Sequence, residues 1–107
     1  MKITLCGSTR FKDEFNEWNK KLTLAGHIVY SVSFFGHADK EDITEKDKYH
    51  LDRVHLVKIL NSDAIFVIDK DRYIGPSTEN EIEWAELNHK YVYYMSERLD
   101  CLELIGG

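Results

Sequence analysis

Short apolar runs alternate with longer amphipathic segments along this chain. Four runs rich in β-branched and aromatic residues predict strands: Lys2 to Cys6, His27 to Val32, Ala64 to Ile68 and Tyr91 to Met95. Three segments with apolar residues at helical spacing predict helices: about Arg10 to Ala25, Tyr49 to Asn61 and Thr78 to Asn88. In the second helix the apolar positions are Leu51, Val54, Val57 and Leu60. The polar stretches between these elements are expected to be loops: Phe34 to Lys48 and Asp69 to Ser77.

This alternation of strand and helix predicts the fold class. Strands that alternate with helices form parallel sheets through right-handed crossovers, with helices on both faces. We therefore expect a three-layer α/β/α domain of the flavodoxin-like (Rossmann-like) class with a parallel sheet of four to five strands. Ala64 to Ile68 is apolar throughout, as a central strand buried on both faces would be. Ligands of such folds lie beyond the carboxyl ends of the strands, which directs attention to the loops Gly7 to Arg10, after Val32, and Asp69 to Thr78.

Composition and charge narrow the function classes. We expect residues 1–107 to form one domain, because 107 residues with 43% hydrophobic content suffice for a single core. The net charge of −5, with no basic run, disfavours duplex nucleic acid as a partner. The longest apolar run is far shorter than the roughly 20 residues of a membrane helix, and the N-terminus has no secretory leader pattern. Cys6 and Cys101 are the only cysteines, so we expect a cytoplasmic protein without disulfides or structural zinc.

The first loop offers groups that suit a phosphate or a carboxylate. Gly7 permits close backbone approach, Ser8 and Thr9 supply hydroxyl groups at a helix start, and Arg10 supplies a guanidinium. The alternative interpretation is that Ser8 or Thr9 only caps the following helix.

Glu81 differs from the other glutamates of its helix. Three of them form a stripe at helical spacing, which is typical of a solvated face: Glu79, Glu83 and Glu86. Glu81 shares a face instead with Ser77, Thr78, Trp84 and Ala85. The positive helix end is expected to keep this carboxylate ionised, while partial burial makes it reactive enough for a nucleophile. Alternatively, Thr78 and Glu81 form a capping box and Glu81 has only a structural role.

The remaining acids and histidines give weaker signals. Asp63 opens the apolar strand, where it either ends the preceding turn or has a functional role. Asp69 and Asp71 alternate with basic residues, as in a solvated loop. The histidines show no metal-ligand spacing, so no metal site is predicted.

The ordered motifs resemble a known family, the nucleoside 2-deoxyribosyltransferases and the related 2′-deoxynucleoside 5′-phosphate N-hydrolases. The resemblance covers Lys2 to about Met95 and rests on four segments in register: Ile3 to Arg10, the turn at Gly26, Asn61 to Val67, and Glu81 to Ala85 followed by a strand. The Cys-Gly-Ser-x-Arg piece is similar to the N-hydrolase branch in particular.

The resemblance implies roles for individual residues. Glu81 falls on the catalytic glutamate, which attacks the anomeric carbon, and Asp63 falls on the aspartate that assists near the base and sugar. Ser8 and Arg10 fall on the loop that contacts the 5′-phosphate in the N-hydrolases. The chain departs from the family pattern at a strand tyrosine, at a residue that contacts the sugar or phosphate, and at an acidic helix position: these are Thr4, Gly75 and His55.

The sequence therefore predicts cleavage or transfer at the N-glycosidic bond of a 2′-deoxynucleoside or its 5′-monophosphate, through a glutamate nucleophile and without a cofactor. Gly7, Ser8, Arg10, Ser77 and Thr78 are the expected substrate- and phosphate-binding residues. The alternative is a non-catalytic nucleotide-binding module of the same fold. The expected partners are a small nucleoside or nucleotide and a second copy of the chain, with neither duplex nucleic acid nor membrane. The aromatic residues considered for the dimer surface are Trp84, Tyr91, Tyr93 and Tyr94.

Overall fold

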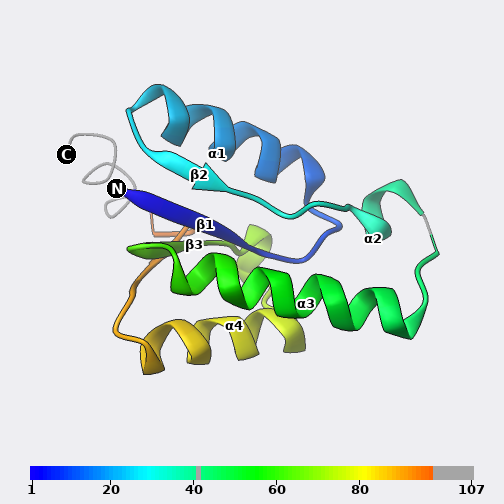
Figure 1. The fold of residues 1–107 in the computed structure, drawn as a ribbon. Helices are drawn as coiled ribbons and strands as arrows, with labels where there is room; N and C mark the ends of the chain where they lie inside the picture. The colour runs from blue at the N-terminus through cyan, green and yellow to red at the C-terminus, as the bar shows by residue number, and fades with distance from the viewer. Residues whose placement is uncertain (41, 98–107) are drawn as a thin grey trace.

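A computed structural model describes residues 1–40 and 42–97, which form one parallel sheet flanked by helices (Figure 1). The elements are β1 (Lys2–Gly7), α1 (Lys12–Leu24), β2 (Ile28–Tyr30), α2 (Gly36–Asp39), α3 (Glu45–Leu60), β3 (Ala64–Ile68), η1 (Lys70–Arg72), α4 (Pro76–Leu87) and β4 (Tyr91–Tyr94). The strand order is β2-β1-β3-β4, and every neighbouring pair is parallel. The predicted flavodoxin-like α/β class is confirmed, with four strands among the described residues.

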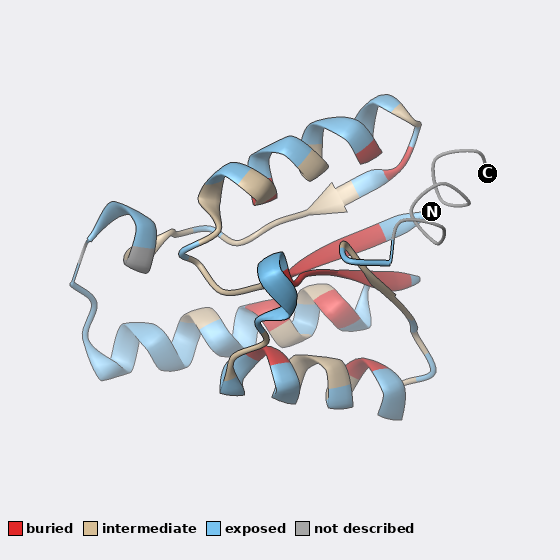
Figure 2. Cartoon of the chain, turned by 180° about the vertical axis from the view of Figure 1, so that it is seen from behind, coloured by how far each residue is buried: buried red, intermediate tan, exposed pale blue. Residues whose placement is uncertain are grey.

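The two central strands divide their side chains between two helical layers. Leu5 and Phe66 pack with residues of α1 on one face of the sheet. Cys6, Ile65 and Val67 pack on the other face with residues of α3 and α4. Because side chains along a strand alternate between faces, Cys6 follows Leu5 onto the opposite side. Figure 2 shows that the middle of β1 and the whole of β3 are buried between the layers.

Several helices differ in extent from those predicted. α3 begins at Glu45, where the Thr44 hydroxyl accepts a hydrogen bond of 3.0 Å from the backbone N–H of Asp47. The stretch expected to be a loop before it contains α2 and the first turn of α3. α4 begins earlier than predicted, at Pro76, whose fixed φ suits a first helical position.

The buried face of α3 is not the apolar stripe of its sequence. Val54, Val57 and Leu60 are exposed at 52%, 53% and 42%, whereas His55 and Ile59 are buried. The apolar spacing identifies the helix correctly, but α3 directs a different face at the sheet. The exposed stripe is thus left on the surface of the described chain.

Two further predictions concern the polar parts of the chain. Asp69 does not lie in a solvated loop, since it is buried and its carboxylate accepts hydrogen bonds from the backbone N–H and hydroxyl of Ser96 at 2.9 and 2.6 Å. Asp71 is exposed, as predicted.

Cys101 lies outside the described residues. No helix within residues 1–40 and 42–97 has the length and apolarity to cross a membrane.

Candidate active site

The chain leaves β1 through a turn that only glycine accommodates. Gly7 has φ of +150°, and a Cβ atom there would lie 2.7 Å from the carbonyl oxygen of Ile68 on the neighbouring strand. This close approach of β1 to β3 sets the path of the loop from Gly7 to Arg10. The loop therefore emerges at the carboxyl edge of the sheet, where ligands of such folds bind.

A cavity of about 690 Å³ opens at this edge, a size within the usual range for small-molecule sites. All three loops that the sequence pointed to contribute to its wall, together with one side of α3. The predicted binding residues are all on that wall: Gly7, Ser8, Arg10, Ser77 and Thr78. Glu81 lines the same cavity, so the fold brings the predicted nucleophile and the predicted binding residues together.

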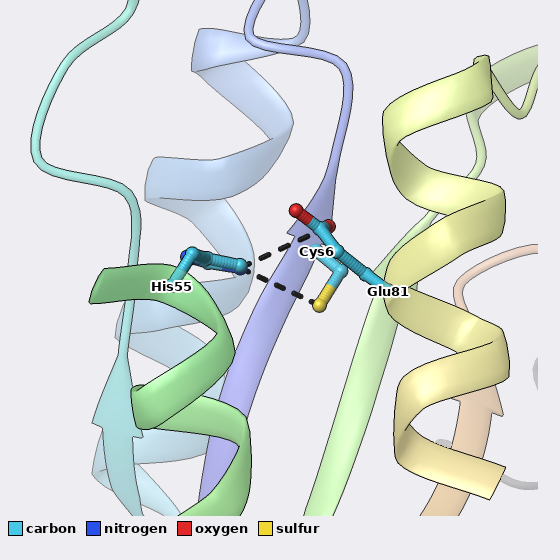
Figure 3. Close-up of side chains that lie close together, drawn as sticks. All are labelled: Cys6, His55 and Glu81. Carbon is cyan, nitrogen blue, oxygen red and sulfur yellow. Dashed lines mark hydrogen bonds and ion pairs between the residues drawn. The ribbon is translucent and has the colours of Figure 1, made fainter. Parts of the chain in front are cut away.

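Three side chains from three elements lie close together, two of them on the cavity wall and the third behind them (Figure 3). Cys6 comes from β1, His55 from α3 and Glu81 from α4. His55 Nε2 lies 3.5 Å from Cys6 Sγ and 3.9 Å from Glu81 Oε1. The side chains of His55 and Glu81 are 8% and 15% exposed, and Cys6 is fully buried. Little water therefore reaches the group except through the cavity.

Burial dominates the protonation of Glu81. It raises the pKa of this carboxyl from 4.5 to about 7, while a hydrogen bond with Cys6 acts in the opposite direction. The negative charge of Asp52 adds to the increase. The expectation that the helix start keeps Glu81 ionised is wrong, because α4 begins at Pro76 and Glu81 lies in its second turn, beyond the strongest influence of the helix end.

The capping alternative for Glu81 is also wrong. The N-cap of α4 is Gly75, and no side chain caps this helix end. Thr78 is buried within the first turn rather than placed before it. In a capping box the threonine must precede the helix, so Thr78 and Glu81 cannot form one here.

The two neighbours of Glu81 are neutral at pH 7. The pKa of His55 is lowered from 6.5 to about 4, mainly by desolvation and to a smaller extent by the positive charge of Lys58. Burial raises the pKa of the Cys6 thiol well above its usual value, and the neighbouring Glu81 raises it too. Glu81 is therefore the member of the trio that titrates near neutrality.

Arg10 is held over the cavity rim by the first and third loops. Its Nε–H donates to the Ser8 hydroxyl at 3.1 Å, and its guanidinium lies 4.6 Å from the centre of the Tyr73 ring. Ser8 also accepts from the backbone N–H of Arg10, at 3.3 Å. α1 has its N-cap at Phe11 and no side-chain cap, so neither Ser8 nor Thr9 caps that helix. The Arg10 guanidinium is therefore held in a position to bind an anionic group.

Asp63 lies at the amino-terminal end of β3, on the opposite side of the sheet from the strand ends that form the cavity. It precedes Ala64, which pairs with Ile3 at the start of β1, and its Oδ2 accepts a hydrogen bond of 2.8 Å from the backbone N–H of Lys2. It is absent from the cavity wall. The structure therefore does not bring Asp63 to Glu81, because the full length of β3 separates Asp63 from the cavity.

A known enzyme has a similar fold. The solved structure of the CMP N-glycosidase BcmB from Clostridium botulinum matches this chain with a TM-score of 0.59 and 17% sequence identity, over 88% of this chain and 70% of that chain. At this identity the likeness is one of fold. No protein-family model and no curated protein matches the sequence.

Sequence reasoning missed several polar residues on or beside the cavity wall, Asp52 among them. Cys6 and His55 contact Glu81 only because β1, α3 and α4 meet, which linear spacing does not show. Lys58 also lines the cavity, and its ammonium donates to the carbonyl of Ser31 at 2.7 Å. The position of His55, which is often acidic in the resembled family, was the one available signal. Lys58 gave none, since a lysine on a helix is usually solvated.

Proposed function

We propose that this chain cleaves or transfers the N-glycosidic bond of a nucleoside or nucleoside 5′-monophosphate, with Glu81 as the nucleophile. The observation that carries the proposal is the Glu81 carboxyl, which is largely desolvated, titrates near pH 7 and faces a nucleotide-sized cavity with Arg10 on its rim. The fold likeness to a CMP N-glycosidase supports the same reaction class. The resemblance to the deoxyribosyltransferases suggests 2′-deoxynucleosides as the finer substrate class.

The proposed reaction proceeds by double displacement. The Glu81 carboxylate attacks C1′, a C1′–O bond forms, and the C1′–N bond breaks with its electron pair leaving on the base. The departing base takes up one proton from solvent, and the attacking water or acceptor base gives one proton up in the second step. Water, or a second base, then attacks C1′ and releases the carboxylate. Neutral His55 and Cys6 beside Glu81 add no charge that would oppose its ionisation.

The phosphate of a 5′-monophosphate would bind at the Arg10 loop of the cavity. Arg10 and the hydroxyl of Ser8 are available there, and Ser77 lies on the same wall. Arginine suits this role because its planar donors match phosphate oxygens. The cation over Tyr73 is already oriented, so little side-chain freedom is lost on binding.

The proposal is tested by following free base from nucleosides and 5′-monophosphates, in both the ribo and deoxy series, with and without an acceptor base. We expect release from a monophosphate, and we expect Arg10→Gln to lower kcat/KM for it about 10- to 100-fold while leaving the nucleoside nearly unaffected. Arg53→Gln is the matched control, because Arg53 is exposed on α3 and absent from the cavity wall.

The same experiment can favour the alternative function. A nucleotide that raises the melting temperature without any release of base would identify a non-catalytic nucleotide-binding module. Loss of nucleoside and monophosphate turnover alike in Arg10→Gln would contradict a phosphate-binding role for Arg10.

The carboxylate that accepts a proton from the attacking water is expected on the cavity wall rather than at Asp63. Asp52 lies there on α3, and its charge already influences Glu81. General acid–base groups usually contribute about 100-fold or more to a rate. We therefore expect Asp52→Asn to lower base release by at least about 10-fold, and Asp63→Asn to change it less than about twofold. Initial rates with one substrate decide the matter, and the reverse ranking would restore Asp63 to the site.

A homodimer and a single domain over residues 1–107 remain proposals. Trp84 is half-buried, with its indole N–H donating to the carbonyl of Leu56 at 3.2 Å, so its polar edge is engaged within the chain. Among the described residues, the apolar stripe on α3 offers more exposed surface for a second copy: Val54, Val57 and Leu60.

A further inference from the structure

The trio at the base of the cavity has the geometry of a three-ligand metal site. Tetrahedral zinc with usual bond lengths places a thiolate sulfur and an imidazole nitrogen about 3.6 Å apart. Cys6 Sγ and His55 Nε2 are 3.5 Å apart. Imidazole nitrogen and carboxylate oxygen around the same ion lie about 3.4 Å apart, against 3.9 Å between His55 Nε2 and Glu81 Oε1. All three donor atoms lie within 4.8 Å of one another, so a small rotation of the Glu81 side chain completes the set.

We propose that Cys6, His55 and Glu81 bind a zinc-type divalent cation, and that this cation and the glycosidic substrate exclude one another. The donors, one sulfur, one nitrogen and one oxygen, are those that zinc accepts in proteins, whereas magnesium and calcium prefer oxygen alone. The inference goes beyond the proposed function, and only its inhibitory part rests on that function.

Charge balance favours the cation at this depth. Cys6 and Glu81 are adjacent acids in a poorly hydrated place, where two negative charges together are costly. A thiolate and a carboxylate neutralise a divalent cation, and the imidazole adds a donor without charge. Binding thus forms a neutral unit from the two acids and the cation, and any protons that the acids still carry are released to solvent.

The surroundings leave the site reachable and partly held in place. His55 and Glu81 line the cavity, so a cation arriving from solvent meets their donor atoms, while Cys6 lies behind them and is fully buried. Three protein donors would leave one position of a tetrahedral ion without a protein ligand, as in zinc sites that keep one position open. The backbone of Leu5 interacts with the His55 ring and favours its protonated form, and a backbone partner for the ring is the usual arrangement around a metal-bound histidine.

A bound cation would occupy the carboxylate oxygens that attack C1′. Glu81 then cannot act as a nucleophile until the cation leaves, so zinc should inhibit base release and a chelator should restore it. The inhibition should be relieved by substrate, since both occupy the same end of the cavity.

The direct test is titration of the chelator-treated protein with Co²⁺, a spectroscopic substitute for Zn²⁺. We expect one ion per chain, with the near-ultraviolet absorption of a thiolate–cobalt bond and the visible bands of tetrahedral cobalt. Cys6→Ser should remove the thiolate band, and His55→Gln should weaken Co²⁺ binding by at least about 100-fold, since even second-layer changes cost 10- to 100-fold. Cys101→Ser, His50→Gln and Glu83→Gln are the matched controls and should bind like the parent chain.

The outcomes separate the metal site from the glycosidase. Base release without Co²⁺ binding up to millimolar concentration would overturn the metal proposal and leave the proposed function standing. Co²⁺ binding without base release would leave the metal proposal standing and overturn the proposed function. If Cys6→Ser fails to fold, His55→Gln decides, because it leaves the thiol in place: unchanged Co²⁺ binding in that variant, or a thiolate band lost in Cys101→Ser instead, would overturn the proposal.

Discussion

Glu81→Gln should abolish base release and at the same time make the protein more stable at pH 8. The amide keeps the size of the side chain but cannot attack C1′, so we expect the rate to fall at least about 10³-fold. Opposite signs for activity and stability are typical of a group kept in an unfavourable environment for function. Glu83→Gln is the control, since Glu83 lies on the exposed stripe of the same helix.

The stability gain follows from the pKa of Glu81. In the unfolded chain the carboxyl ionises around 4.5, and in the folded chain around 7. The unfolded state therefore loses its proton first as the pH rises, and the free energy of unfolding falls between pH 4.5 and 7 by about 3 kcal/mol before it levels off. Glu81→Gln removes this loss, so the two proteins should be alike at pH 4.5 and differ by about 2–3 kcal/mol at pH 8.

Urea unfolding at the two pH values measures this difference. Protonation of His55 lowers the free energy of unfolding as the pH falls from 6.5 to about 4. This happens in both proteins, so the contribution of His55 cancels from their difference. The activity of the parent chain should rise as the pH passes about 7, where Glu81 becomes ionised. A Glu81→Gln protein that still releases base would refute the nucleophile, and one that is less stable at pH 8 would show a structural role instead.

The strands of this fold could be predicted closely from the sequence. β3 has the bounds that its apolar run indicates, because a strand buried on both faces needs apolar residues at every position. β2 is shorter than its run, since only Ile28 to Tyr30 pair with β1. The helix starts were less accurate, because α4 begins with Pro76 and α3 with a Thr44 cap inside stretches that are polar enough to suggest loops.

The site was predictable as far as a single element determines it. Glu81 departs from the exposed stripe of α4, and that departure alone indicated a buried carboxyl. His55 could not be found in this way, because the apolar stripe of α3 suggested the wrong buried face. In the sequence Cys6 is not distinguished from the other strand residues, and its role becomes visible only in the structure, where α3 and α4 pack against it. Asp63 was assigned to the site by the family resemblance alone, although it opens β3 and the cavity lies at the carboxyl ends of the strands.

Gly7→Ala should destabilise the chain more than an alanine at Gly26, the other glycine with positive φ within residues 1–40 and 42–97. At Gly7 the new Cβ meets the backbone oxygen of Ile68 at 2.7 Å, and the φ of +150° is itself unfavourable for alanine. Neither strand can move away easily, because both lie in the centre of the sheet. Strain and overpacking together should lower the free energy of unfolding by roughly 2–5 kcal/mol.

Gly26→Ala separates the two causes. Gly26 has φ of +99°, but no atom lies within 4 Å of the position that a Cβ would take. It should therefore cost about 1 kcal/mol from backbone strain alone. Urea unfolding of both variants tests the prediction, and equal losses would mean that the approach of β1 to β3 is not tight. Because the Gly7 turn also aims Ser8 and Arg10 at the cavity, Gly7→Ala should weaken nucleotide binding as well, while Gly26→Ala, at the opposite end of α1, should leave it unchanged.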